Sequence, residues 1–202
     1  MQKLYIGGVQ IKKIYQNSVP VKRVYKGSEL VWVADPYQPG TVLADAAGAN
    51  TYSVWLPAGI YKLILTGGGG NGTDFWTGAG FMNAGGGSGA TWEGEFENPK
   101  DQQLTLYAGA GAQDSYMDLG GVRMITAVQG GSHSGNSAGG AGVVSVNGSL
   151  RVVSASNVRN GNPGKRTGSY AGGDSVSSRG WGRGGSHLGG EAGGMYLQYL
   201  RV

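Results

Sequence analysis

The amino-acid sequence predicts an all-β protein in which N-terminal β-hairpin repeats precede a glycine-rich β domain. Glycine fills 42 of 202 positions, mostly in tracts between short runs of β-forming residues. No window shows the sustained 3.6-residue period and caps of a helix. The chain also carries 5 Trp and 11 Tyr, too many aromatic residues for a disordered low-complexity chain. The glycines therefore indicate an ordered backbone arrangement that larger side chains would block.

The N-terminal segment contains a ten-residue repeat centred on Tyr5, Tyr15 and Tyr25. Each tyrosine follows an apolar residue and precedes a turn pair, which is the pattern of a β-hairpin. A final apolar strand contains Trp32. We expect residues 1–34 to form a β-repeat module. It either packs on the main domain or attaches the protein to a larger assembly, in which case Tyr5, Tyr15, Tyr25 and Trp32 are the candidate attachment residues.

The positive charge is confined to this segment. Residues 1–35 hold six basic and two acidic residues, a net charge of +4, whereas the rest holds ten of each sign. Nucleic-acid binding would need such a patch together with stacking aromatics. The hairpin repeat already accounts for the tyrosines, and we therefore expect no nucleic-acid partner.

A proline-rich stretch at residues 35–40 opens a predicted linker over 35–50, and a glycine-rich β domain is predicted over 51–202. Strands are predicted at 51–56 and 60–66 on either side of a Pro-Ala-Gly turn, and at 90–96, 103–108, 122–128, 143–153 and 195–202. The tracts between them, such as 67–72 and 85–89, are either extended polyproline-II-like segments that exchange backbone hydrogen bonds or flexible surface loops.

The chain contains no cysteine and only two histidines, His133 and His187, and so no metal or cofactor site is expected. The N-terminus lacks the apolar core of a signal peptide, and no apolar run approaches the length of a membrane span. We expect synthesis in a host cytoplasm and no membrane insertion.

The order of these segments resembles the glycine-rich domain of bacteriophage tail-fibre and tail-tip proteins, a domain also found in some bacterial surface proteins. The resemblance rests on Trp55–Gly59, an apolar strand, the tracts at 67–72 and 85–89, the segment 104–111, and a closing strand after further glycine-rich stretches. It implies a jelly-roll-like β-sandwich with polyglycine-II segments, a homotrimer, and a place in the virion tail. The N-terminal repeats would bind other tail or baseplate proteins, and a host surface glycan or outer surface protein would be the receptor.

Large side chains that interrupt the glycine-rich stretches are candidate receptor-binding residues. Exposed aromatic residues on a rigid scaffold commonly bind partners, and such rings suit stacking on sugars. Equally, they could be pegs that cap the core. The candidates are Phe75, Trp76, Phe81, Met82, Tyr116, Met117, Tyr170, Trp181 and His187.

Glu93, Glu95 and Glu97 alternate on one predicted strand face, opposite Trp92 and Phe96. Such a row is a solvated face, a metal site or a glycosidase carboxylate pair; Asp114 and Asp118 carry the same alternatives. The Gly-rich run at 180–185 lacks the strand–helix context of a nucleotide site. We expect a non-enzymatic attachment protein. The alternatives are a purely structural tail or baseplate component, a glycan depolymerase and a bacterial surface adhesin.

Overall fold

The computed structural model describes residues 5–6, 9–10, 14–16, 19–21, 23–26, 29–33, 37–79, 81–135, 137–167, 172–185 and 189–201. All regular secondary structure in these ranges is β-strand. Since they contain no helix, they contain no helical segment long and apolar enough to cross a membrane. The all-β prediction is therefore confirmed.

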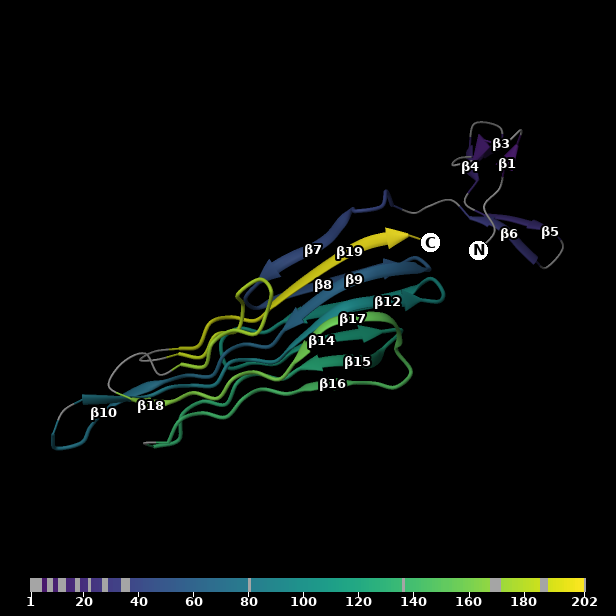
Figure 1. Ribbon diagram of the computed structural model, residues 1–202. Coiled ribbons are helices and arrows are strands. Elements are labelled where there is room, and N and C mark those ends of the chain that lie inside the picture. The colour runs from purple at the N-terminus through teal and green to yellow at the C-terminus, as the bar shows by residue number, and fades with distance from the viewer. Residues whose placement is uncertain are drawn as a thin grey trace.

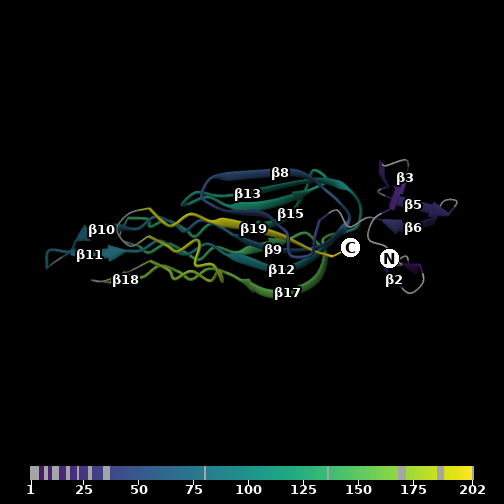
Figure 2. The same cartoon turned by 90° about the horizontal axis from the view of Figure 1, so that it is seen from above.

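Two five-stranded antiparallel sheets pack face to face as a β-sandwich (Figures 1 and 2). The first sheet has the order β17 (Arg151–Arg159), β12 (Thr91–Asn98), β9 (Gly59–Thr66), β19 (Gly194–Arg201) and β7 (Val42–Ala47). The second has the order β16 (Val144–Val146), β15 (Val122–Ala127), β14 (Ser115–Leu119), β13 (Gln102–Ala108) and β8 (Asn50–Leu56).

The core lies between the sheets and follows the two-residue alternation of the strands. Tyr61, Leu63 and Leu65 of β9 are completely buried, as are Leu104 and Leu106 of β13. An aromatic cluster closes the core at one end, where the Tyr61 ring stacks on Phe96 at 5.7 Å and meets Tyr199 edge-on at 5.5 Å. Burial raises the pKa of the Tyr61 hydroxyl well above its ordinary value, and the nearby Tyr37 and Tyr199 add to the shift.

The structure corrects two boundaries predicted from the sequence. Residues 42–47 were placed in the linker over 35–50 but form β7, the edge strand beside β19. Three of its six residues are alanine and Val42 is its one β-branched residue, so it has little of the β-branched and aromatic content that marks a strand. The predicted strand over 143–153 is divided into β16 and β17 by a turn that the Leu150 N–H closes onto the Asn147 carbonyl at 3.0 Å.

The N-terminal segment forms three separate two-stranded hairpins, as the ten-residue repeat predicted. They are β1 (Tyr5–Ile6) with β2 (Val9–Gln10), β3 (Ile14–Gln16) with β4 (Val19–Val21), and β5 (Arg23–Lys26) with β6 (Glu29–Val33). In each hairpin the strands pair across the predicted turn residues, for example Ile6 with Val9.

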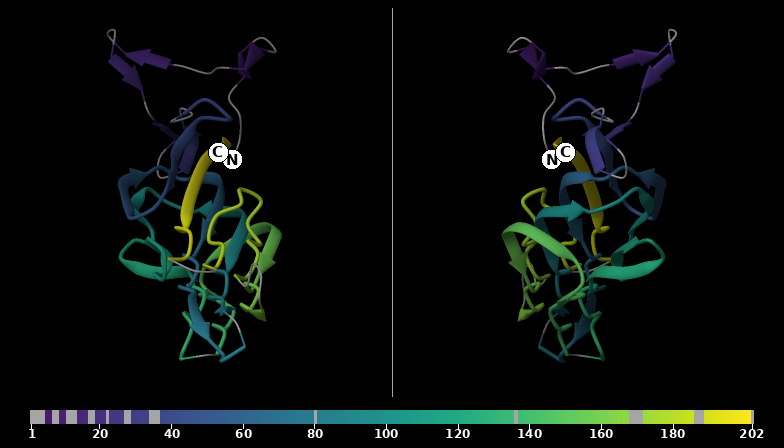
Figure 3. Two further views of the ribbon diagram at one scale, coloured as in Figure 1. Left: turned by 90° about the vertical axis from the view of Figure 1, so that its left-hand side faces the viewer. Right: turned by 90° about the vertical axis from the view of Figure 1, so that its right-hand side faces the viewer.

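The glycine tracts extend from one end of the sandwich. Strands β9, β13, β15 and β17 lead into tracts 67–72, 109–113, 128–133 and 160–165, whereas tracts 85–90, 138–143 and 189–193 lead into β12, β16 and β19. Figure 1 shows these segments running together as one bundle, and Figure 3 shows the molecule from its two ends. Residue Val42 of β7 pairs with Gln198 at the opposite end of the sandwich, where the body of the chain begins.

Tract 85–90 lies at the centre of this bundle and hydrogen-bonds to six neighbouring tracts. Its N–H groups donate to three of them in turn with a three-residue period, so that residues three apart reach the same neighbour at 2.8–3.0 Å. Its carbonyls accept from three others. The donor targets are tracts 160–165, 182–185 and 128–131, and the carbonyls bind 67–70, 139–142 and Gly173.

Glycine is required in the bundle because the tracts approach too closely for a side chain. A Cβ atom added at Gly67, Gly68, Gly69 or Gly70 would overlap a backbone carbonyl of another tract, and the same holds at Gly86, Gly87 and Gly89. The one serine in the central tract, Ser88, is completely buried, and its hydroxyl accepts the Asn162 N–H at 2.7 Å. Residues 67–70 and 85–90 are thus buried and paired, not surface loops.

Two adjacent glycines of one tract test this packing. A methyl group at Gly139 would overlap the Gly131 carbonyl, whereas one at Gly140 meets nothing within 4 Å. We expect Gly139→Ala to lower the free energy of unfolding by about 1–3 kcal/mol through overpacking. Gly140→Ala should be neutral or stabilising by up to about 1 kcal/mol, because it restricts the unfolded chain. Urea denaturation of both variants checks this; equal effects would contradict the packing.

The buried tyrosine makes stability depend on pH above about 10, the ordinary tyrosine pKa. There the unfolded chain ionises at Tyr61 before the folded protein does, which favours unfolding by up to about 1.4 kcal/mol per pH unit. We expect Tyr61→Phe to cost about 1 kcal/mol at neutral pH, through loss of the 2.8 Å hydrogen bond to the Pro57 carbonyl. The variant should also lose less stability than the wild type between pH 9 and pH 11, measured by thermal melts.

Candidate functional site

A small sheet at the far end of the glycine bundle carries four of the predicted receptor-binding residues, Phe75, Trp76, Phe81 and Met82. Strand β10 (Thr73–Trp76) pairs with β11 (Phe81–Ala84), which pairs with β18 (Arg166–Thr167). Figures 1 and 2 show this sheet, here called the tip hairpin, as the end of the bundle farthest from the sandwich. Phe75, Trp76 and Met82 therefore lie on paired strands, not in the loop that their glycine-rich setting predicted.

The tip hairpin exposes a large aromatic side chain. Trp76 is 61% exposed. The Phe75 ring is partly buried, and the Arg166 guanidinium lies 4.8 Å from its centre. Met82, opposite Phe75 in the register, is also partly buried. Phe81 pairs with Trp76 in the backbone register, but its side chain lies outside the described part of the structure.

The hairpin is held rigidly because it joins the two most enclosed tracts. Tract 67–72 leads into β10, and tract 85–90 leaves β11. Those tracts bond directly to each other, through Gly67 N to the Ala90 carbonyl at 3.0 Å and Gly70 N to the Gly87 carbonyl at 2.9 Å. The exposed tryptophan therefore stands on a paired backbone and not on a free loop.

Trp181 lies apart from the tip hairpin and acts as a packing residue. Its ring covers Gly194, where any Cβ atom would overlap the indole. The Arg179 guanidinium lies 5.2 Å from the Trp181 ring and 4.4 Å from the Tyr196 ring. Arg179 also pairs with Asp45 of β7 at 3.1 Å. This cluster ties the segment before β19 to the sandwich, which corresponds to the peg interpretation.

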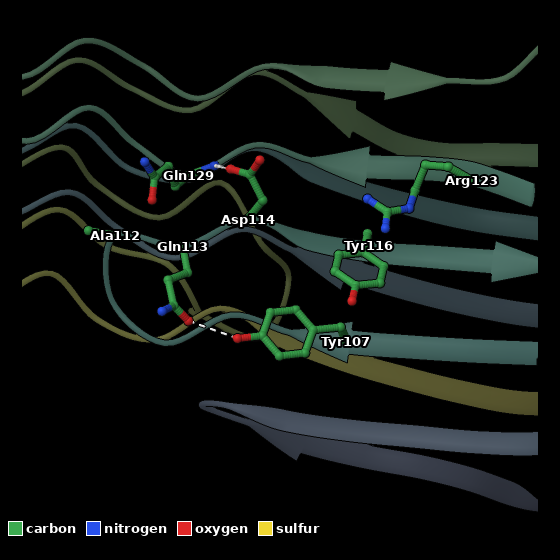
Figure 4. A pocket seen from close by; sticks show the side chains of 7 residues that line it. All are labelled: Tyr107, Ala112, Gln113, Asp114, Tyr116, Arg123 and Gln129. Atoms are coloured by element: carbon green, nitrogen blue, oxygen red, sulfur yellow. Dashed lines mark hydrogen bonds between the residues drawn. The ribbon is translucent and has the colours of Figure 1, made fainter.

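Tyr116 and Met117 belong to strand β14, although their sequence setting predicted a short polar turn. Met117 is completely buried in the sandwich core, which removes it from the residues that a partner could contact. Tyr116 faces outward and lines a shallow recess of about 440 Å³ beside the glycine bundle (Figure 4). The other aromatic residue there, Tyr107, was not among the predicted residues, although the alternation of 104–107 places it on the outer face.

Several predicted residues lie outside the part of the chain that the structure describes. Tyr170 and His187 fall in undescribed segments. Tyr5, Tyr15, Tyr25 and Trp32 lie in β1, β3, β5 and β6, but their side chains are not described.

The three glutamates share one face of β12, as predicted, and each carboxylate has a basic partner, although Glu93 is itself buried. Glu93 lies 3.5 Å from Lys62, Glu95 lies 3.7 Å from Arg201, and Glu97 lies 3.2 Å from Arg151. Of the other two acids considered, Asp118 pairs with Arg123 and Asp114 accepts the Gln129 N–H at 2.8 Å. No group of three or more His, Asp or Glu side chains in the described residues could hold a metal ion. The row is thus an ion-pair ladder across one sheet face.

Neither a scan against protein-family models nor a search of curated proteins found a match to this chain. The candidate site therefore rests on its geometry. One further exposed aromatic residue was missing from the predicted set: Trp55 on edge strand β8 is 62% exposed. The alternation over 51–56 could have identified Trp55 as exposed, because Tyr52 and Val54 face the core and Trp55 faces outward.

Two tryptophans in similar glycine-rich settings should differ in their effect on stability. We expect Trp181→Ala to lower the free energy of unfolding by about 2 kcal/mol or more, because it leaves the surface around Gly194 uncovered. Trp76→Ala should change it by less than about 0.5 kcal/mol, as is usual at exposed positions. Chemical denaturation followed by circular dichroism measures both; a larger loss for Trp76→Ala would show that Trp76 is itself a packing residue.

Proposed function

We propose that this protein is a non-catalytic bacteriophage tail protein that attaches the particle to the host surface. The observation that carries the proposal is the tip hairpin: an exposed aromatic residue held by the two most enclosed tracts of a rigid bundle. Aromatic residues presented by a preorganised scaffold lose little conformational freedom on binding, which favours affinity. The receptor would be a glycan or an outer surface protein of the host.

In this proposal the two ends of the molecule have different binding functions. The tip hairpin meets the host, and the N-terminal hairpins bind other tail or baseplate proteins. The direction of the chain supports this division, because its body begins at the end of the sandwich opposite the glycine bundle. The attachment residues would be Tyr5, Tyr15, Tyr25 and Trp32.

We further propose that the tracts are polyglycine-II helices within a jelly-roll-like sandwich. The three-residue hydrogen-bond period of tract 85–90 supports this assignment, since three residues per turn is the repeat of that helix. Close packing of the same kind between chains would form the homotrimer that the resemblance to tail proteins implies.

Pairing of the three glutamate carboxylates favours binding over hydrolysis. A glycosidase needs one carboxylate free to act on each side of the bond, whereas Glu93, Glu95 and Glu97 each have a basic partner. A depolymerase is therefore the weaker alternative. A purely structural tail component is the other, and it predicts no binding to cells.

Binding of fluorescently labelled protein to a panel of bacterial strains tests the proposal. We expect binding to some strains and loss of at least about tenfold in affinity for Trp76→Ala, in line with removal of an aromatic hot spot. Trp55→Ala is the matched control, because Trp55 is equally exposed but lies on the sandwich; it should bind as the wild type does. No binding to any strain by a multimeric preparation would support a structural component instead.

A further inference from the structure

The recess beside Tyr116 has an aromatic floor and a polar rim. Tyr107 of β13 and Tyr116 of β14 are paired residues, and their rings stack with centroids 5.1 Å apart at 28°. Figure 4 shows the two rings side by side on the sheet, with Gln113 and Asp114 on the side of the glycine tracts and Arg123 on the other. The volume, about 440 Å³, suits a small ligand or one unit of a larger one.

The rim residues retain unused hydrogen-bonding capacity. The side-chain oxygen of Gln113 accepts from the Tyr107 hydroxyl at 2.8 Å and from Ala110 N at 3.2 Å, which leaves its amide NH₂ to donate outward. One Asp114 oxygen accepts from Gln129 N, and the other has no partner within the described residues. The Gln129 side-chain oxygen is buried, and it therefore offers a ligand no acceptor.

Backbone hydrogen bonds to the glycine bundle hold the loop that carries Gln113 and Asp114 in one conformation before any ligand binds. Ala112 N donates to the Gly69 carbonyl at 2.7 Å, and Gly68 N donates to the Gln113 carbonyl at 2.9 Å. Ala112 has a φ of 55°, and no other non-glycine residue in the described ranges has a positive φ. Such backbone strain persists only where the surroundings impose it, and it is concentrated at ligand-binding sites.

We propose that this recess binds an uncharged sugar residue of a glycan, at a site separate from the tip hairpin. The Arg123 guanidinium lies 3.5 Å from the centre of the Tyr116 ring and covers one of its faces. The C–H face of a sugar can lie on the neighbouring Tyr107 ring, while its hydroxyls, each both donor and acceptor, bond to the Asp114 carboxylate and the Gln113 amide. Arg123 pairs with Asp118, so Asp114 is the one charged group of the lining without an ion-pair partner among the described residues, and its charge disfavours an anionic sugar. The inference stands whether or not the tip hairpin binds a host.

Nuclear magnetic resonance of the full-length ¹⁵N-labelled protein tests the proposal, with glucose, galactose, mannose, N-acetylglucosamine and glucuronate as probes. We expect at least one neutral sugar to give saturable shifts in the side-chain amides of Gln113 and Gln129 and in the backbone of 107–116, with a millimolar dissociation constant. Glucuronate should bind at least about tenfold more weakly than that sugar, since like charges oppose it.

Three variants complete the test. Tyr107→Ala and the milder Asp114→Asn should each weaken the sugar titration by about fivefold or more, since each removes one partner of the sugar. Trp76→Ala should leave it unchanged, which separates the recess from the tip. No saturable shift with any neutral sugar would overturn the proposal, as would wild-type affinity in both Tyr107→Ala and Asp114→Asn, or glucuronate binding as tightly as the best neutral sugar.

Discussion

The absence of side chains where one tract faces the carbonyls of another is the constraint on which the rest of this structure depends. Ordering a residue costs about 1–2 kcal/mol in backbone entropy, and glycine loses more than other residues. Each tract-to-tract hydrogen bond returns about 0.5–1.5 kcal/mol, and close Cα–H···O contacts add about 0.5–1 kcal/mol. Because these terms are of similar size, the bundle depends on the sandwich, whose paired strands hold the tract ends in register.

This dependence explains where the chain can place functional side chains. Inside the bundle any Cβ atom at a carbonyl-facing position would overlap a neighbour, as at Gly87 and Gly139. Larger residues therefore lie at tract positions that face solvent, such as Lys165 and Arg183, in the turns between tracts, or on the sandwich. The tip hairpin with Trp76 joins two tracts, and the recess with Tyr107 and Tyr116 lies on the outer face of the sandwich. Variation in a surface-binding residue at either place would leave the packed backbone unchanged.

Alternation and tight turns in the sequence were sufficient to predict β8, β9, β12, β13, β15 and β19, and the row of glutamates on one face of β12. They were insufficient for β7, whose alanine-rich sequence has little strand propensity, and for β10 and β11, whose short paired strands lie among glycines. The sequence also could not show that Trp76 is exposed whereas Trp181 is a packing residue. Both follow the same local pattern, and only the tertiary contact of Trp181 with Gly194 separates a packing residue from an exposed one.

Amide hydrogen exchange of the glycine tracts is the most direct test of this account. The N–H groups of Gly67–Gly70 and 85–90 are all bonded to other tracts, and we expect protection comparable to that of the central strand β9. Gly78 and Gly148, which have open surroundings, should exchange far faster and serve as internal references. Exchange of the tract amides at the rate of these two glycines would contradict a hydrogen-bonded bundle, and with it the rigid support proposed for the tip.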